Sequence, residues 1–228
     1  MEGEIITIPW SRVFSTKEVN EGEGNIEIES NSYLIKTSKM NLLIDAGSKR
    51  IFDVLSEQEI KQIDAVLLTH AHADHIKQLQ ALQERFGFKI YLHLSDHALL
   101  TNSEYNDWKK VGLEGFTAEV DKIKLITDNQ TLHLDNFDFQ VIHTPGHTHG
   151  SVMYYCKKLN ALFTGDMILG KYTWSYQFHE WNKEEKESSI KKIKTFLETL
   201  PKNTKVYPWH GERILLKRLL KINQKLKK

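Results

Sequence analysis

The sequence predicts an α/β fold in which sheets are covered by helices. Strand-like apolar runs recur along the 228 residues, and segments with the spacing of amphipathic helices lie between several of them. The run AVLLT at 65–69 is apolar at four consecutive positions, which is typical of a strand buried on both faces. The run FDFQVIH at 137–143 instead alternates as a half-buried strand does. From this pattern alone, two α/β halves that face each other are one possible arrangement.

The predicted strands follow one another along almost the whole chain. Their runs are IITI, SYLIK, NLLID, AVLLT, KIYLHL, FDFQVIH, SVMYYC, ALFTG and TKVYP. Residues 15–25, between the first two runs, are polar and contain glycine, so we interpret them as an exposed loop or hairpin. No linker rich in proline or glycine divides the chain, and we therefore expect one domain that spans residues 1–228.

Three segments have apolar residues at helical spacing. The first follows the AVLLT run, the second is expected to stop at Pro201, and the third lies at the C-terminus. Their apolar faces are Ile76, Leu79, Leu82 and Phe86; Ile190, Ile193, Phe196, Leu197 and Leu200; and Ile214, Leu215, Leu219, Ile222 and Leu226. Helices with one apolar face are the elements that cover a sheet, in agreement with the predicted fold class.

The composition excludes several kinds of partner. Thirty-one Lys and Arg balance thirty Asp and Glu, and the net charge of +1 gives no whole-molecule field that favours nucleic acid or an anionic membrane. Cys156 is the only cysteine, which excludes an intrachain disulfide. No stretch reaches the roughly 18 apolar residues of a membrane-spanning helix, and the start of the chain lacks the pattern of a secretion signal. The expected location is therefore the cytoplasm.

The strongest functional signal is THAHADHI at residues 69–76, where three histidines and an aspartate directly follow a buried strand. A chance H-x-H-x-D-H in such a chain has a probability on the order of one in a thousand. Residues two apart in an extended segment point the same way, so His70 and His72 are predicted to face one metal ion. Asp74 and His75 lie where the next helix begins, with Asp74 a favoured N-cap residue, and can face a second ion nearby.

Three more candidate ligands each stand just after a strand-like run. They are His147 in TPGHTHGS, Asp166 in LFTGD and His210 in VYPWHG. Ligands and catalytic groups commonly lie on loops at strand ends. Each signal alone is weak, because such residues beside Gly or Pro are usually ordinary loop residues, but their joint order favours a metal site. Imidazole and carboxylate ligands suit zinc and also iron or manganese, so the ligand types leave the metal open.

With these motifs the chain resembles the metallo-β-lactamase superfamily, and within it the glyoxalase II-like hydrolases. The similarity runs from SYLI and LLIDAG through THAHADHI, TPGHTHGS and LFTGD to YPWHG. The resemblance implies a four-layer αββα sandwich that holds two divalent metal ions, zinc before iron or manganese, at one edge between the sheets. It implies a first ion held by His70, His72 and His147, a second held by Asp74, His75 and His210, and a bridging Asp166.

The resemblance also implies a mechanism. Two adjacent cations lower the pKa of a bridging water, so that hydroxide is available as the nucleophile, and they stabilise the charge that develops on the substrate oxygen. By position, Asp74 is predicted to accept or pass on the proton, and His149, two residues after His147, is a candidate proton donor. Asp45 in LIDAG matches an acidic motif that supports the ligand histidines, although from the sequence alone a strand-end turn residue is an equally good interpretation.

The chain departs from the family at several places. Trp209 stands before the last histidine, where glycine is commoner, and the segment after Asp166 lacks the G-x-G-R element of many relatives. Only about eighteen residues follow His210, too few for the substrate-binding extension of a typical glyoxalase II. An aromatic cluster after Asp166 is interpreted as a substrate-facing wall or a cover of the core; it consists of Tyr172, Trp174, Tyr176, Phe178 and Trp181.

We therefore expect a binuclear metal-dependent hydrolase that cleaves a small ester, thioester or lactone. Three alternatives stay open: a phosphodiesterase or ribonuclease of the same fold, a non-haem iron dioxygenase, and a non-catalytic metal-bound binding module. The first usually adds a recognition insertion or a second domain, the second typically uses one iron, and the third would have lost ligands. The expected partner is a small molecule rather than a membrane or nucleic acid, and the oligomeric state is left open. β-Lactam hydrolysis is not expected, because a common secreted class has cysteine at the position of Asp166.

Overall fold

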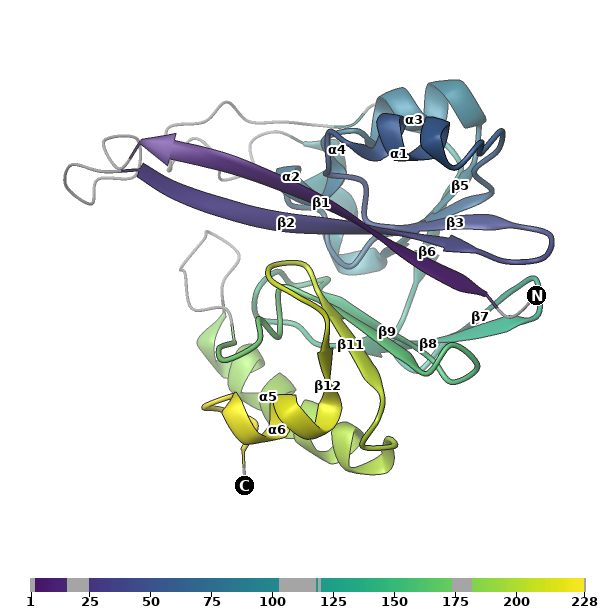
Figure 1. The fold of residues 1–228 in the computed structure, drawn as a ribbon. Coiled ribbons are helices and arrows are strands. Elements are labelled where there is room, and N and C mark those ends of the chain that lie inside the picture. The colour runs from purple at the N-terminus through teal and green to yellow at the C-terminus, as the bar shows by residue number, and fades with distance from the viewer. Residues whose placement is uncertain (1–2, 16–24, 103–117, 119, 174–181, 228) are drawn as a thin grey trace.

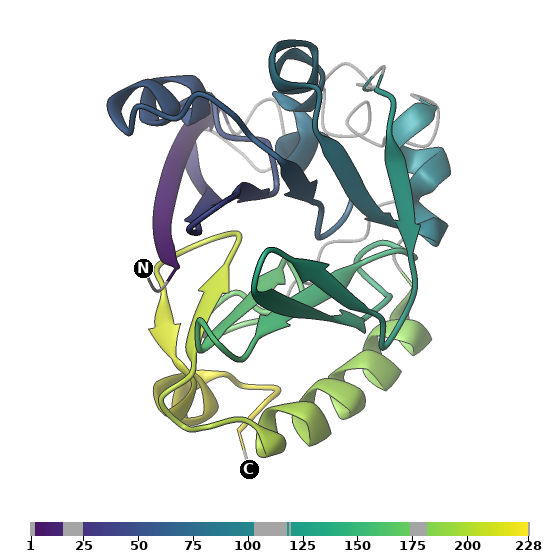
Figure 2. The ribbon, with the colours of Figure 1, turned by 90° about the vertical axis from the view of Figure 1, so that its right-hand side faces the viewer.

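Two six-stranded sheets lie face to face, with helices on both outer sides (Figures 1 and 2). The computed structural model describes residues 3–15, 25–102, 118, 120–173 and 182–227, and for residues 10–15 and 25–30 it describes the backbone alone. The first half of the chain forms one sheet and its helices, and the second half forms the other. This four-layer αββα arrangement confirms the predicted fold class.

The first sheet has the strand order β1 to β6. Its strands are β1 (Glu4–Ser15), β2 (Asn25–Lys36), β3 (Asn41–Ile44), β4 (Ala65–Leu67), β5 (Lys89–His93) and β6 (Ile123–Ile126). The first three are antiparallel, whereas β3 to β6 run parallel and need crossover connections. Those connections contain α1 (Ile51–Glu57), α2 (Ala73–Ile76), α3 (Leu79–Phe86), a short 3₁₀ turn at Leu94–Asp96 and α4 (His97–Thr101).

The second sheet has the order β12-β11-β10-β9-β8-β7. Its strands are β7 (Thr131–Leu134), β8 (Phe137–His143), β9 (Val152–Cys156), β10 (Ala161–Gly165), β11 (Lys205–Pro208) and β12 (Ile214–Leu215). Only the β10–β11 pair is parallel, and its crossover contains α5 (Lys183–Thr199). The side chain of Asn182 caps α5 by accepting a hydrogen bond from the Glu185 amide, and α6 (Leu216–Ile222) completes the outer layer.

Three apolar cores fill the spaces between the four layers. In β4, Ala65 and Leu67 face the core between the sheets while Val66 faces the helices, so this strand is buried on both faces as predicted. In β8, Phe137 faces the core between the sheets, whereas Ile142 packs into the core under α5, so only the first part of this strand is half-exposed. The inter-sheet core fixes the edge at which the strand ends of both sheets meet.

Two of the helix predictions need correction. The first predicted helix is two short helices, α2 and α3, because a turn at residues 77–78 interrupts the helix. In the third, Ile214 and Leu215 form β12 and pair with β11, and α6 ends at Ile222. Backbone pairing to a sheet edge outweighs helical periodicity there. Strands β6 and β7 and helices α1 and α4 were not predicted, because their short runs give little periodic signal.

The expected hairpin at 15–25 is framed by antiparallel pairing of Ser15 with Asn25, while residues 16–24 themselves lie outside the described residues. In the described parts of the chain, no helix combines the length and the apolar character needed to cross a membrane.

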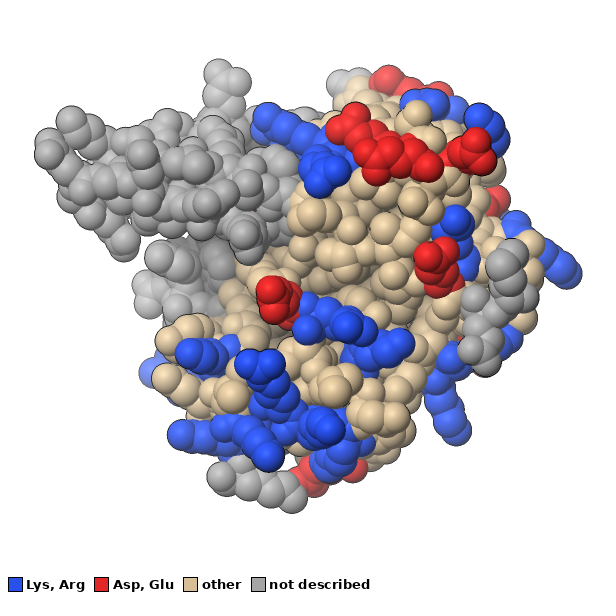
Figure 3. Space-filling model, viewed as in Figure 1, with Lys and Arg blue, Asp and Glu red and all other residues tan. Residues whose placement is uncertain are grey.

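The net charge of +1 hides an uneven distribution of charge. Residues 182–228 contain fourteen basic and five acidic residues, a net charge of +9, whereas residues 1–181 contain seventeen basic and twenty-five acidic residues, a net charge of −8. Lys and Arg side chains accordingly gather in the lower part of the face shown in Figure 3, over α6 and its surroundings. A hollow in this layer is lined by Lys194, Lys202, Lys217, Lys221 and Lys227, among others.

Candidate metal centre

The candidate ligands and the neighbouring residue Asp45 stand beyond the carboxyl ends of strands from both sheets. Asp45 follows β3, and His70 lies three residues beyond the end of β4. In the second sheet, Asp166 follows β10 and His210 follows β11, the parallel neighbour of β10. The loop between β8 and β9 adds His147. Because parallel strands end at the same edge of a sheet, the topology brings these distant parts of the sequence together.

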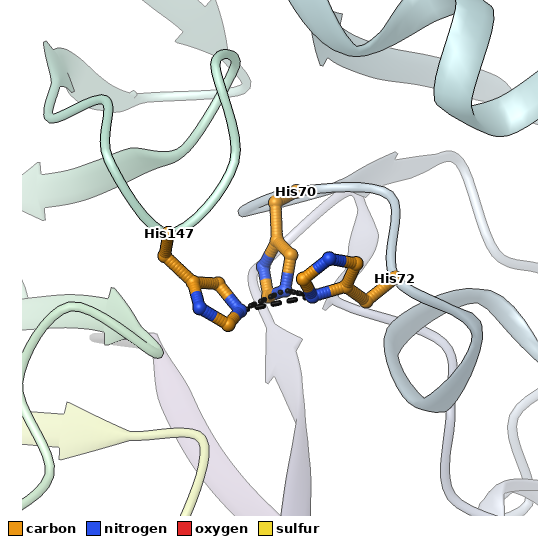
Figure 4. Close-up of side chains that lie close together, drawn as sticks. All are labelled: His70, His72 and His147. Atoms are coloured by element: carbon orange, nitrogen blue, oxygen red, sulfur yellow. Dashed lines mark hydrogen bonds between the residues drawn. The ribbon is translucent and has the colours of Figure 1, made fainter. Parts of the chain in front are cut away.

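Three buried histidines converge on one point (Figure 4). The His70 Nε2 atom lies 2.9 Å from His72 Nδ1 and 3.0 Å from His147 Nε2, and the latter two atoms are 2.9 Å apart. His70 and His72 come from the segment after β4, whereas His147 comes from the opposite sheet. The three nitrogens are close enough for one cation to contact all of them.

The ionisation of these histidines favours ligand chemistry. Burial, and then the charge of neighbouring histidines, holds the pKa values of His70 and His147 well below the usual range. Their imidazoles are therefore neutral near pH 7, and a neutral imidazole carries the lone pair that a metal ion needs. Three converging lone pairs cannot satisfy one another, but a cation between them satisfies all three.

A second group lies beside the first and shares Asp166 with it. The Oδ2 atom of Asp166 is 3.3 Å from His147 Nε2 and 3.6 Å from His210 Nε2, while its Oδ1 atom is 3.4 Å from His75 Nε2. The Oδ2 atom of Asp74 is 3.8 Å from His75 Nε2 and 4.0 Å from His210 Nε2. Asp166 thus lies between two sets of histidines, so all seven predicted ligands meet in one cluster.

Electrostatics and hydrogen bonding indicate that this second group also fits a cation. Burial lowers the pKa of His75, but the charges of Asp74 and Asp45 outweigh this effect and raise the pKa to about 10, so positive charge is favoured at this ring. His75 Nε2 and Asp166 Oδ1 are buried without a hydrogen-bond partner. Buried polar atoms are almost always paired, and a divalent cation would pair both. The His and Asp cluster can therefore bind divalent metal.

Asp45 contacts His75 at the ring nitrogen that does not face Asp166. Its Oδ2 atom is 3.0 Å from His75 Nδ1 and accepts a hydrogen bond from the Thr69 hydroxyl at 2.8 Å, while its Oδ1 atom accepts the Thr69 amide at 2.7 Å. With Nδ1 of His75 donating to Asp45, Nε2 is the nitrogen that faces Asp166, and it can serve as a ligand when a cation replaces its proton. Asp45 is fully buried and has a φ of 57°, a conformation that Asp and Asn tolerate better than most residues. The geometry matches the supporting role implied by the family resemblance.

Asp96 is a buried residue beside the candidate site that the sequence did not reveal. Its buried carboxylate accepts hydrogen bonds from the Ala71 amide at 3.0 Å, the Thr148 hydroxyl at 2.9 Å and the Gly150 amide at 2.6 Å. Burial raises its pKa to about 6, although these three hydrogen bonds oppose the shift. Ala71 lies between His70 and His72, and Thr148 follows His147. Asp96 therefore ties the two loops that carry the converging histidines.

Two glycines permit close approach of the backbone at the site. A Cβ atom on Gly47 would lie 1.3 Å from the carbonyl oxygen of Asp74, and one on Gly165 would lie 2.7 Å from the Thr69 hydroxyl. Gly165 also has a φ of +49° at the β-bulge that ends β10 and presents Asp166. Side chains at these positions would separate the elements that carry the ligands.

Some predicted site residues take other positions. The ring of His149 pairs with Glu185 of α5 at 2.9 Å and is about half-exposed, so its position gives no support to the predicted proton-donor role. Helix α2 begins at Ala73 with His72 as its N-cap, and the expected N-cap role of Asp74 is wrong. Tyr172 is exposed, and the rest of the aromatic cluster, residues 174–181, lies outside the described residues.

Five histidines and two aspartates at one edge of an αββα sandwich define the chain as an enzyme of the metallo-hydrolase class. The chain belongs to the metallo-β-lactamase superfamily, whose family model matches residues 26–199. It is 30% identical over 187 residues to the probable metallo-hydrolase YqgX of Bacillus subtilis, a match that covers 81% of this chain and 86% of that protein. It is also 29% identical over 153 residues to the hydroxyacylglutathione hydrolase GloC of Haemophilus influenzae, covering 63% of this chain and 72% of the relative.

Solved structures show the same fold. The crystal structure of the B3 metallo-β-lactamase BLEG-1 superposes with a TM-score of 0.80 at 28% identity, covering 88% of this chain and 96% of that one. The crystal structure of TTHA1623 in a di-iron-bound form superposes with a TM-score of 0.73 at 27% identity, covering 86% and 95% of the two chains. These comparisons confirm the superfamily predicted from the motifs.

Proposed function

We propose that this protein is a binuclear metal-dependent hydrolase that cleaves a small ester, thioester or lactone. The observation that carries the proposal is the position of Asp166, whose Oδ2 atom faces both His147 and His210 and whose Oδ1 atom faces His75. A single-ion site needs no such shared carboxylate. Retention of every predicted ligand also favours a catalytic role over a binding module that has lost its chemistry.

The seven ligands divide into two sets around the shared carboxylate. In this proposal the first ion is held by His70, His72 and His147, the second by Asp74, His75 and His210, and Asp166 contributes to both. When bound, such divalent ions act as Lewis acids that acidify a water molecule and polarise the substrate carbonyl. Zinc suits these ligands best, and iron is the first alternative because a similar structure was solved in a di-iron-bound form.

The remaining chemistry falls to the protein's own groups. Asp74 is the more accessible of the two carboxylates in the cluster, with its side chain 16% exposed against 3% for Asp166. An accessible carboxylate can take a proton from the attacking water and return it to the leaving group. Asp166 is buried, and although burial opposes its ionisation, His210, His75 and His147 hold its pKa well below the usual range. It therefore remains a charged ligand throughout.

The substrate class is supported by the name of one relative. One relative is named a hydroxyacylglutathione hydrolase, which favours an acyl substrate. We therefore propose a small acyl ester, thioester or lactone as the substrate, processed in the cytoplasm.

A substrate panel tests this proposal. The protein loaded with zinc or iron is assayed against acyl thioesters, lactones, aryl esters and bis-p-nitrophenyl phosphate. The His72→Ala variant removes a converging nitrogen, whereas the His133→Ala control removes an exposed histidine whose ring contacts Asp138. We expect turnover of an acyl substrate by the wild type and the control, and loss of at least about a hundredfold in His72→Ala. Turnover of the phosphodiester alone, or equal turnover by all three proteins, would contradict the proposal.

A further inference from the structure

Trp209 occupies the position before the last histidine, where the sequence departs from the family. Its side chain is almost fully buried, with 1% exposed. Its amide donates to the Gly165 carbonyl at 3.2 Å, and its carbonyl accepts a hydrogen bond from Asn31 Nδ2 at 3.1 Å. The backbone of Trp209 is therefore hydrogen-bonded through both its amide and its carbonyl group. These bonds hold it beside Gly165, which precedes Asp166, and directly before His210.

The indole N–H of Trp209 is directed at a proposed ligand. It donates a hydrogen bond to Asp74 Oδ2 at 3.1 Å. This is the same oxygen that faces His75 Nε2 at 3.8 Å and His210 Nε2 at 4.0 Å. A buried indole N–H nearly always has an acceptor, and here the acceptor is the carboxylate of the second ligand set.

The indole ring also packs against a second member of this ligand set, His75. It stacks on the His75 imidazole with the ring centroids 3.8 Å apart and the planes 25° apart. Gly47 provides the space, because a Cβ atom there would lie 2.9 Å from Trp209 Cζ2. One side chain thus contacts two members of the second set, Asp74 through a hydrogen bond and His75 through its ring.

We propose that Trp209 is a positioning residue that orients Asp74 and so sets the affinity of the second metal position. Without the N–H, the partly exposed carboxylate of Asp74 is free to rotate toward solvent. Its orientation then depends on the cation and on the longer contacts with His75 and His210. Partners of this kind commonly change metal affinity by about 10- to 100-fold when they are removed. The inference rests on the proposed binuclear function, because it assigns Trp209 to one of the two positions.

The Trp209→Phe variant separates the hydrogen bond from the packing. Phenylalanine keeps an aromatic ring that can stack on His75 but has no N–H for Asp74. Tyr154→Phe is the matched control, because it removes from another buried aromatic residue a hydrogen bond of 2.8 Å to the Leu68 carbonyl, which is not a ligand. The metal-free proteins are titrated with Co²⁺ in competition with a chelator, and the two stepwise dissociation constants and the Co²⁺ absorption spectrum are recorded.

We expect the first dissociation constant to be the same in all three proteins. The second should rise by about 10- to 100-fold in Trp209→Phe, with a changed spectrum of the second Co²⁺ equivalent, and should change less than threefold in Tyr154→Phe. An unchanged second constant in Trp209→Phe, or an equal change in both variants, would overturn the role of Trp209 and leave the binuclear function intact. A wild-type protein that binds a single Co²⁺ would overturn both proposals.

Discussion

The carboxylate of Asp45 and the imidazole of His75 form a buried pair, with 3.0 Å between Oδ2 and Nδ1. The pair fixes the ring so that its second nitrogen faces Asp166. Asp45 lies directly after β3 and His75 lies in α2, so the contact also joins the first sheet to the short helix that carries Asp74. The position of one ligand therefore depends on a residue that contacts no metal position itself.

The Asp45→Asn variant should weaken metal binding without unfolding the protein. Asparagine tolerates the positive φ of this position, but its amide group must face one of the donors on Thr69 or His75, where the carboxylate accepts all three hydrogen bonds. We expect metal affinity to fall by about 10- to 100-fold, measured by chelator competition. Affinity equal to that of the wild type would show that Asp45 is only a turn residue.

Asp96→Asn should affect both stability and the metal centre. The three groups that surround Asp96 all donate to it, so an amide nitrogen would leave at least one buried donor without an acceptor. The expected loss in the free energy of unfolding is about 1–3 kcal/mol, measured by urea denaturation of the metal-free protein. The control Asp138→Asn removes an exposed contact with His133 and should cost less than about 0.5 kcal/mol. Equal losses in the two variants would contradict the inference that Asp96 holds together the two loops that carry the converging histidines.

Gly47→Ala should be among the most damaging single-methyl additions. Its Cβ atom would overlap the Asp74 carbonyl oxygen at 1.3 Å, so the start of α2 must move. We expect a loss of at least about 3 kcal/mol in stability together with loss of the second metal equivalent. Gly170→Ala serves as the comparison, because a Cβ atom there meets nothing within 4 Å and carries only the strain of a φ of +57°, about 1 kcal/mol. Comparable stability of the two variants would be the contrary result.

His93 should make the folded protein sensitive to acid. Burial, followed by the charge of the stacked His143, lowers the pKa of His93 to about 4; Asp128 opposes the shift, and Lys192 adds to it. The unfolded chain binds this proton near pH 6.5, so the free energy of unfolding falls as the pH drops from about 6.5 to 4. Asparagine at position 93 can still accept the Ser95 amide but does not titrate in this range. The loss of stability with acid, measured by urea denaturation, should be smaller in His93→Asn than in the wild type. If the free energy of unfolding fell equally with pH in both proteins, His93 would not be the residue responsible.

The sequence predicts best what depends on contiguous patterns. The apolar run of β4 and the motif that follows it predicted that His70, His72, Asp74 and His75 lie together beyond the strand end, because one short segment carries all four. The helix predicted to end before Pro201 is also confirmed: it is α5, which ends at Thr199. In contrast, β12 has the apolar spacing of a helix, and only its pairing with β11 reveals the strand.

The residues that support the site were harder to predict. Asp96 lies in a 3₁₀ turn far along the chain from Ala71 and Thr148, and nothing local distinguishes it from a surface aspartate. Trp209 was noticed as a departure from the family, but its hydrogen bond to Asp74 depends on how the two sheets pack. Likewise, the two-residue spacing of His149 from His147 favoured a ring that faces the site as a proton donor, whereas the ring pairs with Glu185. Contacts across the layers decide these roles, and a linear pattern carries little information about them.

The central claim is that one shared carboxylate joins two metal positions, and anomalous diffraction from crystals of the zinc-loaded protein tests it most directly. We predict two anomalous peaks, one among His70, His72 and His147 and one among Asp74, His75 and His210, with Asp166 contacting both. A single peak, or two peaks of which only one contacts Asp166, would contradict the account.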